Sequence, residues 1–428
     1  MPLYPVFYLG VTGVGWFSGI ALAALYALLT YVFIYFNIPS VQWWGGYVPD
    51  LRWSYTSALV VAAGLFIHRR QITRNPLKDS PAYRLLILYL LWMLITVPLS
   101  VNTDLAFSKV YDFFRYVVVF GFILAIIDTT GKLRAYIWII LTQIAYLSWT
   151  ARSYFHGARL DGVGPGDAGD ANSLAILLIS FLPFFLVFLL QGKKWEKITA
   201  LVCLPITLNC LAMTRSRGGF LGFATSMIVL FLLERVPQVR KRLIILSMIT
   251  AVALFSLSDQ AFKDRLMSTF NEDTSTASAG RVDNWRYGLQ MSRDHLLGAG
   301  GGSYMYLSPF YLPANLLEHH AGTRAAHNTY LLVLVEQGIV GLVIFFLFLL
   351  RLAKTAFLSK QQILLVIEQK GQQQDHAMLY MFNNATLAGM ASLMVAGFFC
   401  DSLYFEGLYF LTAIFPAVYH TSKRELDR

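Results

Sequence analysis

Long apolar blocks alternate with short polar connections along the 428-residue chain. The blocks lie near residues 16 to 36, 53 to 68, 83 to 99, 110 to 127, 134 to 154, 172 to 190, 198 to 213, 216 to 233, 243 to 257, 327 to 350, 378 to 399 and 404 to 420. A helix needs about 20 mostly apolar residues to cross the hydrocarbon core of a bilayer. The pattern predicts an all-α polytopic membrane protein with about 12 transmembrane helices, which form a single transmembrane domain over residues 1–428.

The longest polar interruption is the segment 258–326. It contains Ser and Thr clusters and ends with a glycine run at 298–302, which aromatic residues follow. Because loops held by rigid elements often carry function, we expect 258–326 to be the one large extramembrane segment and the glycine run to be a mobile lid. The run does not match a nucleotide-binding loop, since no lysine follows it.

Composition excludes a soluble enzyme. Hydrophobic residues make up 57% of the chain and charged residues 14%, whereas ordinary soluble domains have about 25% charged residues. The three cysteines, Cys203, Cys210 and Cys400, lie in or at the edges of apolar blocks. They provide neither a disulfide framework nor a cysteine-type zinc site.

Charge predicts the orientation of the spans. With a cytoplasmic N-terminus, 21 of the 34 Lys and Arg residues fall on cytoplasmic connections, whose net charge is +13, while the outer connections carry −2. Cytoplasmic loops are enriched in Lys and Arg, so the count predicts that both termini are cytoplasmic and that 258–326 lies outside. Topology thereby explains the overall charge of +10, which implies no nucleic-acid partner.

The eighth span begins on the outer side with Arg215, Ser216 and Arg217, which two glycines follow. Ser216 is expected to cap this helix, and the free amide groups of a helix N-terminus, together with an arginine fork, suit a phosphate. Residues two apart point about 200° apart on a helix, so at most one arginine should face a given pocket. The alternative is that the arginines only anchor the helix at lipid headgroups.

The tenth span begins with His327, which Asn328 and Tyr330 follow. A helix N-terminus and nearby arginines disfavour a charged imidazole, so His327 would stay neutral and suit a general base. The alternative role is a structural hydrogen bond. Glu336 lies half a turn around the same helix, and we interpret it as a helix–helix hydrogen-bonding residue instead of the partner of His327.

Two polar groups resemble metal sites only loosely. Residues 318–320, which read Glu-His-His, could join His327, but they lack the spacing of a ligand pair. Asp167, Asp170 and Asn172 could bind a cation, although a capped loop that leads into the sixth span is favoured. The sequence therefore predicts no metal site and no cofactor.

Three segments resemble the O-antigen ligase and polymerase superfamily. They are TRSRGGFLGF at 214–223, GRVDNWRYGLQMSRDHLLGAGGGSY at 280–304 and HNTYLLVLVEQGIVGLVIFF at 327–346. The last segment matches the family's His-Asn-x-Tyr-Leu, Glu-x-Gly and Gly-Leu pattern at every position. DANSLA at 170–175 is similar to the family's Asp-x-Asn loop, with Ala171 where proline is common.

The resemblance implies a GT-C-type glycosyltransferase of the bacterial inner membrane that needs neither a metal nor a nucleotide. Its donor would be a glycan on undecaprenyl diphosphate, presented at the periplasmic face. His327 would deprotonate the acceptor hydroxyl, while Arg217 and Arg281 would bind the diphosphate during an inverting attack. Further substrate contacts would come from Arg215, Ser216, Arg286, Asn328 and Tyr330.

The sequence leaves the acceptor open. An O-antigen ligase-like enzyme would transfer the glycan to lipid A-core or a similar acceptor, a polymerase would join repeat units, and a protein O-oligosaccharyltransferase would use protein hydroxyls. All three would share the donor site. A transporter of lipid-linked glycan would instead need charges along a path across the bilayer, yet the central parts of most spans lack charge apart from Glu336.

Overall fold

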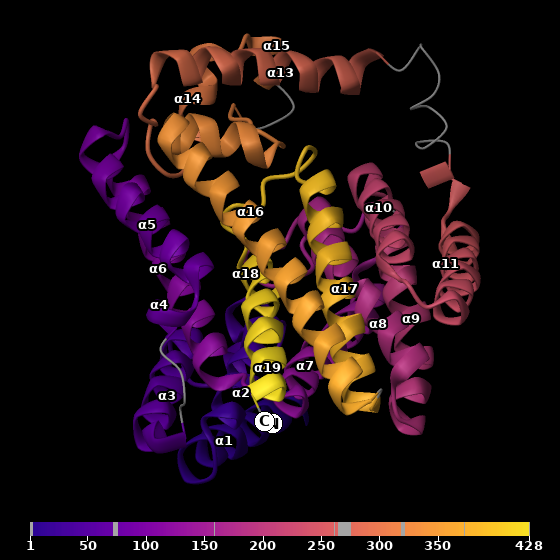
Figure 1. The fold of residues 1–428 in the computed structure, drawn as a ribbon. Coiled ribbons are helices and arrows are strands. Elements are labelled where there is room, and N and C mark those ends of the chain that lie inside the picture. Colours follow the sequence, from indigo (N-terminus) through magenta and orange to yellow (C-terminus); the bar gives the residue numbers. More distant parts are fainter. Residues whose placement is uncertain are drawn as a thin grey trace.

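The computed structural model describes residues 3–71, 76–157, 159–260, 262–263, 275–317, 322–371 and 373–427. All regular elements in these ranges are helices (Figure 1), which confirms the predicted all-helical chain. The helices of ten or more residues are α1 (Leu3–Ala21), α2 (Ala24–Phe36), α3 (Trp53–Ile67), α5 (Pro81–Thr96), α6 (Thr103–Ile126), α7 (Thr130–Ala151), α8 (Ala171–Gln191), α9 (Lys194–Thr214), α10 (Arg217–Leu233), α11 (Pro237–Leu257), α13 (Ser275–Asp294), α16 (Thr329–Lys370), α17 (Gln374–Ala396) and α19 (Ile414–Asp427). The shorter α-helices are α4 (Pro76–Asp79), α14 (Ser303–Tyr311), α15 (Ala314–Leu317) and α18 (Glu406–Thr412), and short 3-10 turns follow several helices.

Helix α8 lies at the centre of the bundle. Every residue from Ser173 to Phe188 is buried, and α9, α10 and α17 pack around it. A helix that is apolar on all sides is stable only when it is covered on all sides. The N-terminus of α8 is therefore held at a fixed place in the bundle, and so is the end of the loop that leads into it.

The first predicted span is in fact a helical hairpin. Helices α1 and α2 run antiparallel on either side of a turn at residues 22–23, and a Cβ on Gly19 would lie 2.5 Å from that of Ala27. The ring of Tyr8 lies 5.0 Å from that of Trp44, so the chain begins beside the α2–α3 connection. The prediction of one span at 16 to 36 is wrong, because two glycine- and alanine-rich faces permit close antiparallel packing. The cytoplasmic N-terminus, which is predicted from the distribution of Lys and Arg, stays a prediction.

Six of the described helical segments are long and apolar enough to cross a membrane. They are α1, α8, α9, the long α16, and the helices α2 and α5. The segments of α2 and α5 include the 3-10 turn that follows each helix. Helices α3 and α10 are apolar but shorter. These segments support a multi-pass membrane protein, while the count of about 12 spans stays a prediction.

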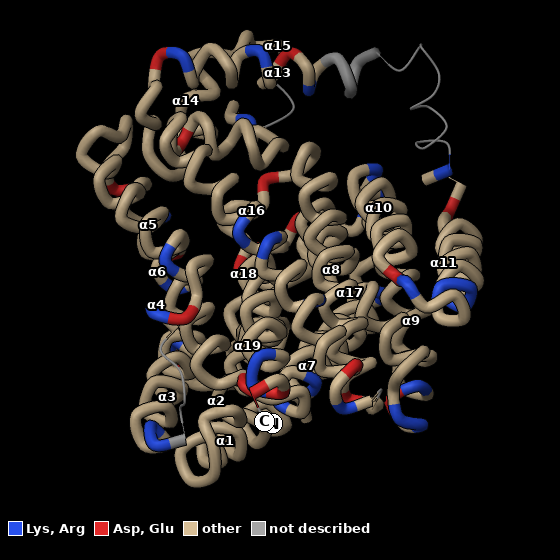
Figure 2. The backbone as a smooth tube through the Cα atoms, viewed as in Figure 1, with Lys and Arg blue, Asp and Glu red and all other residues tan. Residues whose placement is uncertain are grey.

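Helices α13, α14 and α15 form a layer across one end of the bundle (Figure 1). They come from the segment 258–326, whose described part is thus mostly helical and packs on α16. Figure 2 shows charged residues gathered near helix ends and in one internal group beside α16 and α18. We refer to the end with α13 as the outer end and to the opposite end as the inner end.

The glycine run lies packed into a break in α16, which contradicts the expected mobile lid. Gly338 has φ +66° and ψ −171°, and this break exposes backbone groups of the helix. The amides of Ala299 and Gly300 donate to the carbonyl oxygens of Val335 and Glu336, both at 2.9 Å. A Cβ on Gly338 would lie 2.4 Å from the carbonyl carbon of Leu297. Glycine is required here for close backbone approach, not for hinge motion.

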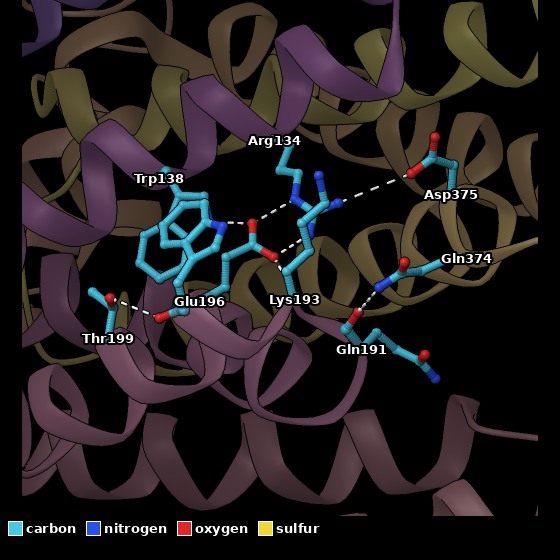
Figure 3. Close-up of polar contacts among 9 residues, drawn as sticks. Arg134, Trp138, Gln191, Lys193, Glu196, Thr199, Gln374 and Asp375 are labelled. Atoms are coloured by element: carbon cyan, nitrogen blue, oxygen red, sulfur yellow. Dashed lines mark hydrogen bonds and ion pairs between the residues drawn. The ribbon is translucent and has the colours of Figure 1, made fainter.

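A buried ion pair fastens the inner ends of α7 and α9 (Figure 3). Arg134 donates two hydrogen bonds to the Glu196 carboxylate, whose side chain is fully buried. The indole of Trp138 and the amide of Lys193 also donate to Glu196, at 2.8 and 2.6 Å. All the hydrogen-bonding capacity of the carboxylate is used inside the protein, as a buried charge requires.

Candidate active site

The N-terminus of α10 is built as predicted at the level of the backbone. The hydroxyl oxygen of Ser216 accepts a hydrogen bond from the amide of Gly219 at 3.2 Å, which caps the helix. The same hydroxyl donates to the side chain of Asn172 at 2.9 Å. Arg217 is the first helical residue. The Ser216 cap and its bond to Asn172 of α8 hold this end of α10 in place. They therefore also fix the position of Arg217.

Arg159, Arg217 and Arg324 lie near enough to Arg281 for their charges to act on it. Burial, together with the guanidinium groups of Arg159, Arg217 and Arg324, lowers the pKa of Arg281. Arg159 is held by the carbonyl oxygen of Thr214 at 3.0 Å and by the Asn172 side chain. The structure therefore brings Arg217 and Arg281 together and adds two arginines that the sequence analysis missed.

An apolar cavity of about 590 Å³ lies between α10, α11 and α13 and reaches two of these arginines. It is lined by Arg217, Gly218, Phe220, Leu221, Phe223, Ala224, Ala251, Leu254, Phe255, Arg281, Val282, Trp285 and Phe399. Among the residues that the structure describes, the only charged ones that line it are the two arginines. A ligand with an anionic head and a hydrocarbon tail would complement such a cavity.

Arg215 and Arg286 lie apart from this cluster. Arg215 forms an ion pair with Asp259 and donates to the carbonyl oxygen of Gly157 at 2.8 Å. It adopts a left-handed backbone (φ +47°) between α9 and α10, so the helical 200° argument does not apply to it. Arg286 faces solvent with 78% of its side chain exposed, 3.8 Å from Asp283.

His327 precedes α16 in a left-handed backbone conformation (φ +48°). The side chain of Asn328 caps the helix by accepting from the amides of Tyr330 and Leu331 at 3.0 and 3.1 Å. The buried carboxylate of Asp401 accepts from the amide of Asn328 at 2.9 Å and from the amide of His327. These bonds hold the backbone of His327 at the strained φ, which costs of order 1–3 kcal/mol.

Asp401 belongs to the loop 397–405, which we name the strap. Burial raises the pKa of Asp401 to about 6, although the backbone amides of the α16 N-terminus oppose the rise. Thr329 donates from its hydroxyl to the carbonyl oxygen of Cys400 at 2.7 Å, and its amide donates to that of Gly397 at 2.7 Å. The strap therefore fastens the start of α16. Sequence analysis offered no signal for Asp401 beyond an acidic residue at a span end.

Helix α13 connects the arginines to His327. The side-chain amide of Asn284 donates to the carbonyl oxygen of Ala325 at 3.0 Å, and the indole of Trp285 donates to that of Ala326 at 3.2 Å. Arg281 lies about one turn earlier on the same helix. Helix α13 therefore carries one arginine of the cluster and also holds the segment that leads into His327.

Tyr330 packs against α17. Its hydroxyl donates to the carbonyl oxygen of Met394 at 2.7 Å, and its ring stacks on Phe346 with a centroid distance of 5.7 Å. Its visible contacts are therefore those of a packing residue. Its predicted substrate contact stays a prediction.

A second, polar cavity of about 520 Å³ lies on the other face of the strap. Its lining includes Asp401 and Ala326, next to His327, and Glu336 from α16. Glu336 accepts hydrogen bonds from the Tyr404 hydroxyl at 2.7 Å and from the amide of Tyr304 at 3.4 Å. The hydrogen-bonding role expected for Glu336 is thus observed, with partners on the strap and α14.

The acidic loop before α8 serves as a cap. Asp170 accepts hydrogen bonds from the amides of Asn172 and Ser173 at 2.9 and 3.2 Å, which confirms the favoured interpretation. Asp167 accepts from the Tyr35 hydroxyl at 2.8 Å. Among the residues that the structure describes, no three or more His, Cys, Asp or Glu side chains group as metal ligands. Residues 318–320 lie outside the described ranges.

Comparison with known proteins confirms the resemblance for part of the chain. A family model described as O-antigen ligase matches residues 199–346, a range that contains Arg217, Arg281 and His327. A protein of Rickettsia felis named "Putative polysaccharide ligase" is 26% identical over 175 residues. A similarly named protein of Rickettsia conorii is 25% identical over 175 residues. Each match spans 40% of this chain and 42% of the relative.

Proposed function

We propose that this protein transfers a glycan from undecaprenyl diphosphate to an acceptor hydroxyl at the periplasmic face of the bacterial inner membrane. The observation that carries the proposal is the arginine cluster at an apolar cavity. A polyprenyl chain would lie along Phe220, Leu254 and Phe255, and its diphosphate would meet Arg217 and Arg281. Planar guanidinium forks bind phosphate oxygens in pairs, more specifically than a point charge does.

The energetics of the cluster support an anionic ligand. Burial lowers the pKa of Arg281 most, and repulsion from the guanidinium groups of Arg159, Arg217 and Arg324 lowers it further. A diphosphate would remove this repulsion and receive several charge-assisted hydrogen bonds. The same groups would stabilise the charge that develops on the diphosphate as it leaves.

The proposed reaction is a single inverting displacement. His327 takes the proton of the acceptor hydroxyl while the acceptor oxygen forms a bond to the anomeric carbon. The bond from that carbon to the phosphate oxygen breaks on the opposite side, and its electron pair leaves with undecaprenyl diphosphate. Asp401 acts as a positioning residue, because it holds the backbone on which His327 is carried. Ser216 and Asn328 act mainly by capping the two helix ends.

The proposed orientation places the outer end in the periplasm and the C-terminus in the cytoplasm. Helices α16 and α19 end toward the side opposite α13 (Figure 1), and their last turns carry Lys370 and Arg424, which agrees with the enrichment of basic residues on the cytoplasmic side. The overall architecture would be of the GT-C type, with the reaction at the mouth of the bundle. Metal-free catalysis follows from the arginines, which supply the positive charge that a divalent ion otherwise provides.

Reconstitution with a glycan on undecaprenyl diphosphate tests the proposal. The purified protein receives the donor together with lipid A-core, with a second lipid-linked repeat unit or with a protein acceptor. A single addition to lipid A-core is expected for an O-antigen ligase-like enzyme. A ladder of products would assign a polymerase, and a glycosylated protein would assign an O-oligosaccharyltransferase. If the donor crosses the bilayer and its glycan–phosphate bond stays intact, the proposal fails and the protein is a transporter.

A further inference from the structure

The polar cavity and the arginine cavity lie on either side of the strap. Phe399 of the strap lines the arginine cavity, whereas Asp401 and Tyr404 line the polar one. The segment 326–328, which carries His327, is bonded to the strap at this point. Ala326, the residue before His327, lines the polar cavity, so a ligand in that cavity would lie near the proposed base.

The polar cavity has its own route to the surface. An open cleft of about 820 Å³ lies along the α2–α3 connection and shares Ile38, Ser54 and Arg115 with the polar cavity. The arginine cavity instead opens between α10, α11 and α13. Two ligands could therefore enter the two cavities from different sides of the molecule without crossing.

The charge of the polar cavity is opposite to that of the arginine cluster. Its charged lining residues are Lys109, Asp112, Arg115, Asp167, Asp170, Glu336, Asp401 and Glu406. Both cations are already engaged: Arg115 lies 3.4 Å from Asp112 and 3.7 Å from Glu406, and Lys109 lies 3.7 Å from Asp112. The other carboxyl groups accept hydrogen bonds from backbone amides and tyrosine hydroxyls, for example Asp167 from Tyr35. An additional anion would be repelled here.

The walls suit a molecule rich in hydroxyl groups. Carboxylate oxygens accept hydrogen bonds strongly, and a sugar hydroxyl can donate to them. Tyr35, Tyr116 and Tyr404 add aromatic surface beside these oxygens, and aromatic rings pack against apolar faces of ligands. The cavity thus combines acceptors for hydroxyl or ammonium groups with flat apolar surface.

The two cavities also differ in their relation to known proteins. Apart from Phe399, the arginine cavity is lined by residues within 199–346, the range that matches the O-antigen ligase model. Most residues of the polar cavity lie outside that range, in α2, α3, α6, the loop before α8 and the strap. This division fits a shared donor site and an acceptor site that is particular to this chain.

We infer that the polar cavity binds the acceptor, which reaches it along the α2–α3 connection, and that this acceptor is a neutral or amino sugar, not an acidic or phosphorylated one. The inference rests on the proposed function, since it assigns the second substrate of the same reaction. It names a substrate class that the arginine cluster alone does not imply.

The test uses three p-nitrophenyl β-glycosides that differ by one group: the glucoside, the glucosaminide and the glucuronide. Binding to the protein in lipid nanodiscs is measured by saturation-transfer NMR without donor. We expect the glucoside and the glucosaminide to bind and the glucuronide to bind at least about tenfold more weakly, a difference of about 1.4 kcal/mol. Equal binding of all three, preference for the glucuronide, or no binding by any of them would overturn the inference.

Substitutions at Ser54 locate the binding site. Ser54 lines both the cleft and the polar cavity. Ser54→Lys should strengthen glucuronide binding and weaken glucosaminide binding, and Ser54→Glu should do the reverse. The same pair of changes at the exposed Ser153, in the outer connection before α8, should alter neither. Ser54 variants that leave the order of affinities unchanged would place the sugar elsewhere and overturn the inference.

Donor measurements separate this inference from the proposed function. Inhibition of transfer by citronellyl diphosphate, a short polyprenyl diphosphate, should be the same in wild type and in both Ser54 variants. If sugars bind in the expected order but no glycan is ever transferred, the proposed function fails and the sugar site stands. If transfer occurs and acidic acceptors are used as well as neutral ones, only the inference fails.

Discussion

Arginines from other segments bind the two ends of α9 in opposite environments. At the inner end, Arg134 is paired with the buried carboxylate of Glu196 at the first turn of the helix. At the outer end, Arg159 binds the carbonyl oxygen of Thr214, the last residue of α9, and lies near Arg217 and Arg281. One end joins opposite charges, and the other brings like charges together.

This difference distinguishes an arginine that is paired within the protein from an arginine that we propose to bind a ligand. A buried pair with its hydrogen bonds satisfied is complete within the protein, and breaking it leaves an uncompensated charge. Burial, together with the nearby charges of Arg159, Arg217 and Arg324, lowers the pKa of Arg281, so the charged form of Arg281 makes the unliganded protein less stable than it would otherwise be. The diphosphate that we propose as ligand would compensate the charges of this cluster. The following predictions test the contrast, from the largest expected effect to the smallest.

The largest loss is expected at the outer end from His327→Ala. Removal of a general base typically lowers the rate by about 100-fold to 10,000-fold, and folding should survive because the bonds of this segment to Asp401 come from the backbone. Transfer is measured on purified protein, with the melting temperature as a check of folding. His156→Ala, at an exposed histidine of another outer loop, serves as the control. Near-normal transfer by the His327 variant would reject its role as base.

Arg134→Gln should destabilise the protein by about 3–5 kcal/mol, because Glu196 would remain buried without its charged partner. Transfer per folded molecule should stay normal. Unfolding is followed in increasing denaturant. Lys132→Ala removes the more exposed pair with Asp128 and should cost no more than about 1 kcal/mol. Equal losses in the two variants would show that the inner pair is no more important than a surface contact.

Arg281→Lys should lower the rate of transfer by about 10-fold to 100-fold, because lysine lacks the planar fork of arginine. This factor corresponds to the loss of one hydrogen bond to a charged group, which contributes about 1.5–3 kcal/mol. Arg293→Lys, which changes an exposed residue on the same helix, should leave transfer unchanged. The comparison uses initial rates at fixed donor concentration. Wild-type rates for the Arg281 variant would reduce this arginine to a membrane anchor.

Arg281→Met should raise the stability of the unliganded protein by up to about 1 kcal/mol, since it removes one of the mutually repelling charges. Inorganic pyrophosphate should then raise the melting temperature of the wild type more than that of the variant, because a ligand stabilises the state that binds it. A lower melting temperature for the variant would mean that Arg281 contributes to the fold as Arg134 does.

Chelation should have the smallest effect. We expect transfer to continue in excess EDTA, because the arginines already supply positive charge beside the leaving group. Initial rates before and after dialysis against the chelator give the measurement. A loss that a divalent ion restores would revive a metal role for residues 318–320 or for the loop with Asp167.

Local rules explain which site features sequence analysis could anticipate. Ser216 and Asn328 cap their helices because capping depends on residues two or three positions apart. The burial of α8 follows from its uninterrupted apolar composition. The start of the chain was predicted wrongly, because the length of an apolar stretch does not reveal a tight turn at residues 22–23 inside it.

The sequence by itself determined the helical class, the helix ends that carry Arg217 and His327, and the motifs shared with O-antigen ligases. Only the tertiary structure decided which charged groups become neighbours. Arg159, Arg324 and Asp401 reach the site from separate segments, while Arg215, two residues from Arg217, turns to Asp259. The physical reason is that helix ends and caps depend on a few adjacent residues, whereas the electrostatic environment of a side chain depends on how distant segments pack.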